Sequence, residues 1–396
     1  MTKSNTGVVV LSAVRTAIGS FGGTLKNFSP AELGTLCATE AIKRANIPLN
    51  QIGSTVIGKV IHNGPKDAYL SRVIGIDAGL PINSHAVTLN RLCGSGLEAI
   101  IQAAQQIQLG DVDAALAGGT ESMSTSAYTL QSNRWGQKMG NSVMLDELTT
   151  TLQDPWDNNP MGITAENVAE KYAISRKQQD DYAAQSHLKA ARAIEQGHFK
   201  SQIVPIEITS RKGTHLFDTD EHVRADTTAE KLATLKPYFK KDGSVTAASS
   251  SGINDGAAIL VLMSEQKAQE QGLQPIGRLI DYARAGVEPS LMGTGPIPAV
   301  QQVFEKTGLT IKDMDIIESN EAFAAQALCV ANELNFPAHK VNPNGGAIAL
   351  GHPVGATGAI LTTKCLHELK RINGQYGLVT MCIGDGQGIA AIFEAL

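Results

Sequence analysis

The sequence predicts an α/β fold, and three observations support this prediction. Short runs of apolar and β-branched residues alternate with segments of helical periodicity along most of the 396 residues. Hydrophobic residues make up 42% of the chain and charged residues 18%, so a large and well-covered core is expected. The chain contains 39 glycines, which allow backbones to approach closely where helices lie against sheets.

The predicted strands are short apolar runs bounded by turn-forming residues. They cover residues 8–14, 55–61, 87–90, 114–117, 257–263, 315–318 and 378–383. Helical spacing predicts helices over residues 30–45 and 97–109. In the second of these, apolar residues from Leu97 to Ile107 line one face, and Gly110 provides a natural end.

The middle of the chain, residues 122–249, has a different composition. It is polar, rich in loops and poor in predicted strands, and one strong helix is predicted over residues 176–196. Ser175 and Gln178 form a capping box at the start of this helix, and Gly197 follows its end. Because basic and acidic residues are nearly balanced here, we interpret the segment as an inserted lid and not as a basic arm.

Two stretches of the chain show the same order of elements. In the first, a strand leads into CGSG at residues 93–96, and a helix, a turn and a strand ending at residues 118–119 follow. In the second, NGGAIALGHPVGATG at residues 344–358 is followed by a helix and by a strand that ends at residues 382–384. This repetition predicts a duplicated βα core whose two halves meet face to face.

The overall charge and the cysteines exclude several classes of protein. A net charge of −5 provides no basic excess for a nucleic-acid surface. The five cysteines are far apart and include no CxxC pair, which argues against a disulfide framework or a zinc ribbon and for a reducing compartment. No apolar run is long enough to span a bilayer, and neither end resembles a signal peptide or a peroxisomal address. We therefore expect a soluble cytoplasmic protein that binds neither nucleic acid nor membrane.

Cys93 is the first candidate for chemistry, because it lies at a strand-to-helix junction with glycines at 94 and 96. Lowering a thiol pKa from ~8.5 to 7 requires about 2 kcal/mol of preference for the thiolate. A helix N-terminus supplies roughly 0.3–1 kcal/mol, so the thiol needs a further partner such as an imidazole. A buried structural cysteine in a glycine turn explains this motif equally well.

His352 is the candidate partner, and Cys382 is the second candidate thiol. His352 is flanked by glycine and Pro353, which favours a rigid loop at a site, although a lone histidine is more often structural. Cys382 ends an apolar strand in CIGDGQG, which has neither the lysine of a P-loop nor the context of a dinucleotide motif. Two thiols and a histidine at glycine-rich strand ends suit an enzyme in which one thiol attacks an acyl group and the other moves protons.

Several blocks of sequence resemble the signature segments of thiolases, from the first predicted strand to the end of the chain. They are NRLCGSGLEA (90–99), GGTESMS (118–124), NEAFAAQAL (320–328), GGAIALGHPVGATG (345–358) and CIGDGQG (382–388). Shorter matches are MGITAENVA (161–169), INDGAA (253–258) and MGTGPIPA (292–299). The resemblance implies a five-layered α-β-α-β-α core of two similar halves, with a loop domain that holds coenzyme A. On this basis residues 1–121 and 250–275 form the N-terminal half, 122–249 the loop domain, and 276–396 the C-terminal half.

The resemblance also implies a role for each catalytic residue. Cys93 is acylated by a thioester while His352 takes its proton, and Cys382 removes an α-proton from a second acetyl-CoA. Asn320 holds a water that stabilises the enolate oxygen together with His352, although an asparagine alone is also typical of a turn. The backbone N–H groups of Cys93 and Gly384 form the other oxyanion hole.

For the substrate, the resemblance implies a second set of contacts. The positions that match coenzyme A contacts of the family are Leu152, Met161, Arg224, Phe239, Ala247, Ser251, Ala322 and Phe323. Met292 is expected to fill the acyl pocket, which favours a short substrate. An alternative for Arg224 is a surface ion pair with Glu221 or Asp220.

Three positions depart from the family pattern and bear on substrate binding. Pro160 stands where many short-chain thiolases have histidine, and Lys231 replaces a small polar residue near the coenzyme. Asp385 lies in a loop that is usually all glycine. A carboxylate facing Cys382 would raise the pKa of that thiol, so we expect Asp385 to point away from it.

The sequence therefore predicts an acetyl-CoA C-acetyltransferase that reversibly joins two acetyl-CoA into acetoacetyl-CoA and CoA through an acyl-cysteine. No cofactor or metal is expected beyond the CoA thioesters, and the family implies a homo-oligomer, either a tetramer or a dimer. The main alternative is a degradative 3-ketoacyl-CoA thiolase that acts on longer chains. Residues 342–343 resemble the sequence of that branch, whereas residues 292–299 resemble the biosynthetic branch. A ketoacyl synthase would have a second histidine in place of Cys382. A lipid-binding protein of the same fold would be expected to lack a catalytic residue.

Overall fold

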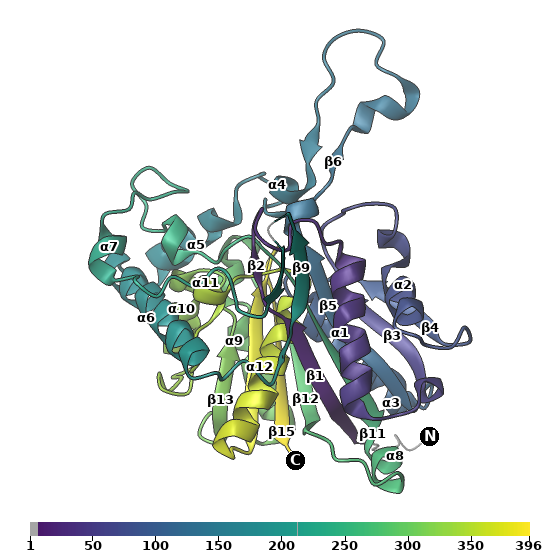
Figure 1. Cartoon of the computed structure of the whole chain (residues 1–396). Helices are drawn as coiled ribbons and strands as arrows, with labels where there is room; N and C mark the ends of the chain where they lie inside the picture. The colour runs from purple at the N-terminus through teal and green to yellow at the C-terminus, as the bar shows by residue number, and fades with distance from the viewer. Residues whose placement is uncertain (1–6, 212) are drawn as a thin grey trace.

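The computed structural model describes residues 7–211 and 213–396, and it confirms the predicted α/β fold (Figure 1). Strand pairing runs without interruption through both halves of the core, in the order β13-β14-β15-β12-β1-β11-β5-β3-β4. Within the described residues, no helix combines the length and the apolar character needed to cross a membrane.

Five strands form the N-terminal half. They are β1 (Val8–Thr16), β3 (Ile52–Gly58), β4 (His85–Leu89), β5 (Ala114–Ser122) and β11 (Asn254–Ser264). β3 pairs in parallel with β4 and β5, while β11 pairs antiparallel with β5 and with β1. Apart from β4 and one intermediate residue of β3, these strands are buried along their whole length, as expected for a sheet covered on both faces.

The C-terminal half repeats this pattern. Its strands are β12 (Gly277–Gly286), β13 (Met314–Ser319), β14 (Tyr376–Ile383) and β15 (Gln387–Ala395). β13 pairs in parallel with β14, and β15 pairs antiparallel with β14 and β12. A single parallel bridge between Ile317 and Val341 takes the place of the β3–β4 pair. The predicted duplication is thus confirmed, and antiparallel pairing of β1 with β12 joins the halves.

The helices complete five layers. α1 (Pro30–Ala45) covers the outer face of the N-terminal half and α9 (Pro296–Thr307) that of the C-terminal half, while α3 (Ser95–Leu109) and α12 (Thr357–Ile372) lie between the sheets. The two central helices approach so closely that a Cβ on Gly96 would lie 2.7 Å from the backbone nitrogen of Ala359. A Cβ on Gly358 would likewise collide with the backbone of Leu97, so both positions require glycine.

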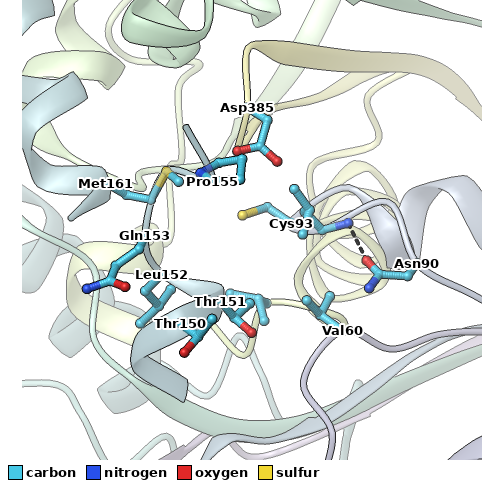
Figure 2. Close-up of a pocket in the computed structure, with 13 residues that line it drawn as sticks. Val60, Asn90, Cys93, Thr150, Thr151, Leu152, Gln153, Pro155, Met161 and Asp385 are labelled. Atoms are coloured by element: carbon cyan, nitrogen blue, oxygen red, sulfur yellow. Dashed lines mark hydrogen bonds between the residues drawn. The ribbon is translucent and has the colours of Figure 1, made fainter. Parts of the chain in front are cut away.

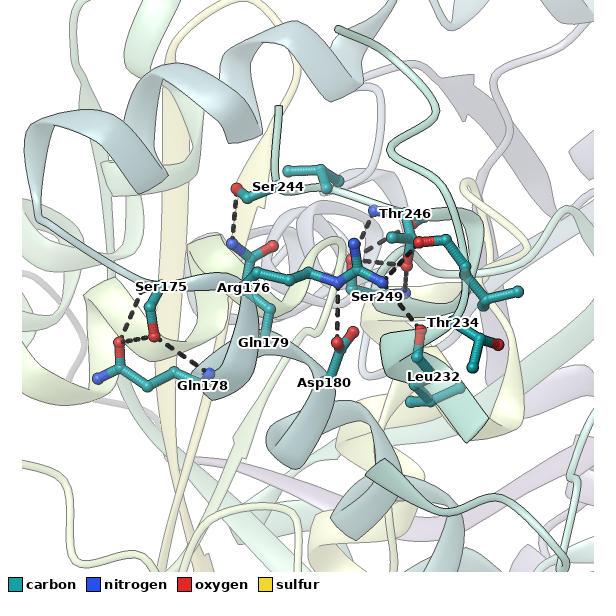
Figure 3. Close-up of polar contacts among 12 residues, drawn as sticks. Ser175, Arg176, Gln178, Gln179, Asp180, Leu232, Thr234, Ser244, Thr246 and Ser249 are labelled. Atoms are coloured by element: carbon teal, nitrogen blue, oxygen red, sulfur yellow. Dashed lines mark hydrogen bonds and ion pairs between the residues drawn. The ribbon is translucent and has the colours of Figure 1, made fainter. Parts of the chain in front are cut away.

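The predicted lid helix is confirmed as α6 (Arg176–Glu195), and it anchors the neighbouring segment (Figure 3). The Ser175 hydroxyl accepts from the backbone N–H of Gln178, and the Gln178 side chain accepts from the N–H of Ser175 at 2.8 Å. Arg176 pairs with Asp180 at 2.8 Å and donates to the carbonyl oxygens of Leu232 and Leu235, also at 2.8 Å. The first turn of α6 therefore fixes the end of α7 (Ala229–Ala233).

The middle segment contains more regular structure than predicted. Besides α6 and α7 it includes α4 (Glu147–Thr151), α5 (Met161–Lys171), β6 (Tyr128–Thr129), β7 (Leu145–Asp146), β8 (Ile203–Val204) and the hairpin of β9 (Ile206–Ser210) with β10 (Gly213–Phe217). Helix α5 begins after Pro160 without a side-chain cap, so it lacks the start signal that identified α6. The remaining elements are β2 (Gly19–Ser20), α2 (Leu70–Asp77), α8 (Glu265–Glu270), α10 (Ala324–Glu333) and α11 (Ala347–Leu350).

The strand predicted over residues 55–61 has the wrong ends, because it spans Ile52–Gly58. Val60 and Ile61 leave the sheet, and their N–H groups donate to the buried carboxylate of Glu121 at 3.1 and 3.2 Å. Their apolar side chains suggested a strand, whereas the hydrogen bonds to a residue 60 positions away decide the backbone path. Strands β12 and β15 were not predicted, since glycine and charged residues interrupt their apolar pattern.

A buried ion pair ties β1 to the middle segment. Arg15 and Asp220 are both fully buried and lie 2.7 Å apart. Asp220 also accepts from the N–H of Ile18 at 2.8 Å, and Arg15 donates to the Gln202 side chain at 2.8 Å. Each charge therefore has the hydrogen bonds that make burial tolerable.

We predict that Asp220→Ala destabilises the protein strongly, because the guanidinium of Arg15 remains buried without a counter-charge. The expected loss is about 3–5 kcal/mol of unfolding free energy, measured by denaturant titration. Asp226→Ala is the control, since Asp226 pairs with the exposed Lys231 and its loss should leave the midpoint unchanged. Equal midpoints for Asp220→Ala and the wild type would contradict the importance of this pair.

Candidate active site

The loop that carries Cys93 is held in one conformation by local hydrogen bonds. Leu92 has φ of 46°, a left-handed conformation that is uncommon for a residue with a side chain. The Asn90 side chain accepts from the N–H of Leu92 at 2.8 Å, and the Ser95 hydroxyl donates to the Leu92 carbonyl at 2.7 Å. Strain that is over-determined in this way is typical of functional sites, and here it directs Cys93 away from the sheet.

Cys93 opens into a cavity of about 210 Å³ (Figure 2). Residues from five separate regions of the chain line it: Val60, Asn90, Leu92, Cys93, Thr150, Thr151, Leu152, Gln153, Pro155, Met161, Val354, Gly384 and Asp385. Three of the predicted site residues, Leu152, Met161 and Gly384, are therefore brought to Cys93. Val354 comes from the loop of His352, two residues further along the chain.

The surroundings of Cys93 keep its thiol protonated at neutral pH. Burial, with smaller contributions from the carboxylates of Asp385 and Glu121, raises the pKa of Cys93 to about 11. The backbone N–H groups of Gly384 and Cys93 oppose this shift because they can donate to the sulfur. Two N–H donors thus converge beside the nucleophile, which is the arrangement expected of an oxyanion hole.

His352 is buried and carries a free ring nitrogen. The Thr357 hydroxyl donates to the Pro353 carbonyl at 2.9 Å, so at 2.7 Å it must accept from Nδ1–H of His352. This assigns the tautomer in which Nε2 is unprotonated, and Nε2 has no partner among the described residues. Burial lowers the pKa of His352 to about 4, so the ring is neutral and able to accept a proton. No hydrogen bond between His352 and Cys93 is found in the described part of the chain.

Cys382 and Asn320 lie at the same end of two adjacent parallel strands. Ser319 at the end of β13 is in register with Thr380 of β14, and the N–H of Asn320 donates to the Thr380 carbonyl at 3.0 Å. Neither polar atom of the buried Asn320 side chain has a partner among the described residues, so both remain available for a ligand or water. Burial, and after it Cys93, raise the pKa of Cys382. Gly384, two residues after Cys382, lines the cavity of Cys93, so the two motifs meet here.

Most of the other predicted contact residues surround Cys382. Met292, Ala322 and Phe323 are buried in one apolar cluster with Cys382, and Met161 and Phe239 pack against it. The rings of Phe239 and Phe323 meet edge to face at 6.0 Å. Met292 is only 4% exposed, so its side chain is packed inside this cluster.

Ser251, Ala247 and Arg224 lie outside this cluster. Ser251 donates its N–H to the Ala322 carbonyl at 3.0 Å, whereas Ala247 and Arg224 are exposed. The alternative of an ion pair for Arg224 is wrong, because its two candidate partners are engaged elsewhere. Asp220 binds Arg15, and Glu221 accepts from the hydroxyl of Thr24 at 2.7 Å. Lys231 is also engaged, since it pairs with Asp226 at 2.7 Å.

Two buried acids that were not predicted hold the site together. Glu121 accepts from the N–H of Gly355 at 2.9 Å as well as from the loop after β3, so it fastens the His352 loop to the cavity wall. Glu321 accepts from Ser186 at 2.6 Å and Asn342 at 2.8 Å, joining α6 to the segment after β13. Their positions inside two of the quoted motifs were the only sequence signal, because partners 21 to 234 residues away are not apparent from a single sequence.

All five cysteines are free thiols. In residues 7–211 and 213–396 there is no group of three or more His, Cys, Asp or Glu side chains arranged to hold a metal ion. The chemistry available to the described site is therefore that of two thiols, an imidazole, an amide and convergent backbone N–H groups.

Comparison with known proteins agrees with this geometry. The family model for the thiolase N-terminal domain matches residues 8–266, and that for the thiolase C-terminal domain matches residues 273–395. Beta-ketothiolase BktB from Cupriavidus necator is 53% identical over 390 residues, covering 98% of this chain and 99% of that protein.

Solved structures give the same result. The acetyl-CoA acetyltransferase of Bacillus anthracis superposes with a TM-score of 0.97 at 47% identity over the whole of both chains. Human mitochondrial 3-ketoacyl-CoA thiolase in complex with CoA has a TM-score of 0.96 at 40% identity, covering 99% of this chain and 98% of that one. Since both halves of the duplicated core match family models and full-length relatives, this chain belongs to the thiolase family.

Proposed function

We propose that this protein is an acetyl-CoA C-acetyltransferase that reversibly joins two acetyl-CoA into acetoacetyl-CoA and free CoA. The observation that carries this proposal is the pair of neighbouring thiols, Cys93 and Cys382, with the N–H of Gly384 directed at the first. A single thiol would suffice for hydrolysis or simple acyl transfer. A second thiol beside it supplies the acid and base that carbon–carbon bond formation requires.

The first half-reaction acylates Cys93. Because its thiol is protonated at neutral pH, the proton must leave as the sulfur attacks the thioester carbonyl. His352 has an unprotonated Nε2 and a fixed ring, which suits it to take this proton and deliver it to the departing CoA sulfur. The N–H groups of Cys93 and Gly384 stabilise the negative oxygen, and such donors contribute about 2.7–4 kcal/mol in comparable sites.

The second half-reaction uses Cys382 as the base. Cys382 then takes an α-proton from the second acetyl-CoA, and the carbanion attacks the acyl-cysteine. Asn320 has two unpaired polar atoms with which to hold a water that, together with His352, stabilises the enolate oxygen.

Coenzyme A is proposed to bind along the loop domain, residues 122–249, between the two core halves. The N-terminal half comprises residues 1–121 and 250–275, and the C-terminal half comprises residues 276–396. Leu152 and Met161 line the cavity, and the unpaired guanidinium of Arg224 is available to the nucleotide end. Pro160 caps α5 beside Met161 without a polar side chain, so coenzyme contacts at this point are apolar.

A short acyl group is favoured by the apolar cluster around Cys382. Met292 and Phe323 occupy the volume next to the thiol, which supports acetyl and acetoacetyl groups over longer chains. The alternative, a degradative 3-ketoacyl-CoA thiolase, uses the same chemistry and differs only in the size of this pocket.

A homo-oligomer is proposed from the arm formed by residues 126–146. Figure 1 shows this segment projecting from the body of the molecule around β6. Trp135 and Met139 on it are 91% and 90% exposed, and Val143 is also exposed. Large apolar side chains grouped in this way are typical of surfaces that bind another chain, and a tetramer or dimer would cover them. The five free cysteines fit a reducing compartment, and we propose the cytoplasm.

We predict that the two thiols separate the half-reactions. Cys93→Ala should abolish both acetylation of the protein by acetyl-CoA and all turnover, because no nucleophile remains. Cys382→Ala should still be acetylated but fail to form acetoacetyl-CoA. Intact-protein mass spectrometry follows the first step and acetoacetyl-CoA absorbance the second. Cys329→Ala, a buried thiol on α10, is the matched control and should retain both. Turnover by Cys93→Ala or normal condensation by Cys382→Ala would refute the assigned roles.

We also predict that thiolysis is fastest with acetoacetyl-CoA and declines as the 3-ketoacyl chain lengthens. Each methylene that does not fit should cost roughly tenfold or more in kcat/KM. Met292→Ala should open the pocket and increase the relative rate with longer chains. Rates that rise with chain length in the wild type would overturn the choice of substrate and favour the degradative alternative.

A third prediction concerns the arm. Replacing both Trp135 and Met139 by serine should reduce the mass of the assembly measured by light scattering, because the apolar contacts are lost. Leu109→Ser, at an isolated exposed leucine, should leave the mass unchanged. A monomeric wild type, or an unchanged mass in the double variant, would exclude this role.

A further inference from the structure

Asp385 is the only charged side chain among the described residues that line the Cys93 cavity. It lies in the turn between β14 and β15 with φ of 66°, and Gly386 follows with φ of 81°. Figure 2 shows its carboxylate directed into the cavity that also receives the Cys93 thiol. The backbone N–H of the preceding Gly384 reaches the Cys93 sulfur, so Asp385 is adjacent to the point where a thioester carbonyl would bind.

The protein leaves this carboxylate without a partner. Oδ1 of Asp385 is buried and accepts no hydrogen bond, and no ion pair in the described part of the chain includes this residue. Its pKa is raised by burial and by the nearby carboxylate of Asp154. The Asp385 carboxylate also raises the pKa of Cys93, an effect that the sequence did not predict. A buried acceptor with no donor is unfavourable until a ligand supplies one.

The neighbouring polar side chains in the cavity do not supply that donor. The other polar side chains of the lining are Asn90, Thr150, Thr151 and Gln153, and none of them donates to Oδ1 of Asp385. An acetyl group has no donor either. An acyl group with a hydroxyl close to the thioester, in contrast, would place its O–H within reach of the Asp385 carboxylate. Asp385 is one residue away from Gly384, whose N–H belongs to the proposed oxyanion hole. Hydrogen bonds to charged acceptors are stronger than those between neutral groups.

We infer that Asp385 is a specificity residue that favours acyl groups bearing a hydroxyl near the thioester. This inference rests on the proposed acylation of Cys93. The step itself is ordinary thioester exchange: the Cys93 sulfur bonds to the acyl carbon, the bond from that carbon to the CoA sulfur breaks, and the thiol proton passes to CoA. No oxidant or further reactant is required.

Glycolyl-CoA and propionyl-CoA provide the test, because their acyl groups have the same number of heavy atoms and differ by a hydroxyl in place of a methyl. The rate of acylation of the full-length protein is measured by rapid quench and intact mass for the wild type, Asp385→Gly and Asp385→Asn. Glycine suits the positive φ of this position. The ratio of the glycolyl rate to the propionyl rate should fall about 10-fold to 100-fold in Asp385→Gly. Asp385→Asn, which keeps an oxygen acceptor without the charge, should be intermediate.

Asp111→Asn, at an exposed position outside the cavity, controls for the change in net charge and should keep the wild-type ratio. A ratio that is the same in the wild type, Asp385→Gly and Asp385→Asn would overturn the inference. Acetyl-CoA in the same assay distinguishes the two proposals. If acetyl-CoA labels wild-type Cys93 while the ratio does not change, only the role of Asp385 fails. If acetyl-CoA does not label Cys93, the proposed function fails and this inference fails with it.

Discussion

The backbone contact between α3 and α12 is the constraint on which the rest of the site depends. Gly96 and Gly358 allow the N-terminal turns of the two helices to touch without side chains between them. One helix follows the Cys93 loop and the other follows the His352 loop, so this contact helps to set the distance between the Cys93 thiol and the His352 ring. Any side chain at either glycine would separate the loops, and interiors this densely packed transmit such displacements.

Around this contact, the fold satisfies the supporting groups and leaves the reactive groups free. Glu121, Glu321 and Asn254 each accept or donate several hydrogen bonds that fix loops from distant parts of the chain. Nε2 of His352 and the amide of Asn320, in contrast, are buried without partners. Unsatisfied polar groups destabilise a folded protein, and although the described residues contain others, these two belong to residues that the proposed reaction uses, so a substrate or water would complete them.

Much of this arrangement could be predicted from the sequence, since it depends on local signals. The capping box of α6, the extent of α1 and most buried strands follow from periodicity and caps, and the glycine-rich motifs identify Cys93, His352 and Cys382. Long-range hydrogen bonds could not be predicted. Glu121 ends β3 early by binding the N–H groups that follow it, and Asp220 is taken by Arg15, so the ion pair considered for Arg224 does not form. In each case a partner distant in sequence overrides the local pattern.

The order of strands also governs how the chain folds during synthesis. β1 is made first, but its partners β11 and β12 lie about residues 254–286, so the strand has neither neighbour until most of the protein has been translated. The whole loop domain emerges in the meantime. A mostly apolar strand that is buried in the folded protein therefore waits without these two neighbours through roughly ten or more seconds of elongation, given rates of about 5–20 residues per second. The duplicated core that positions the two thiols thus makes the nascent chain dependent on protection from aggregation.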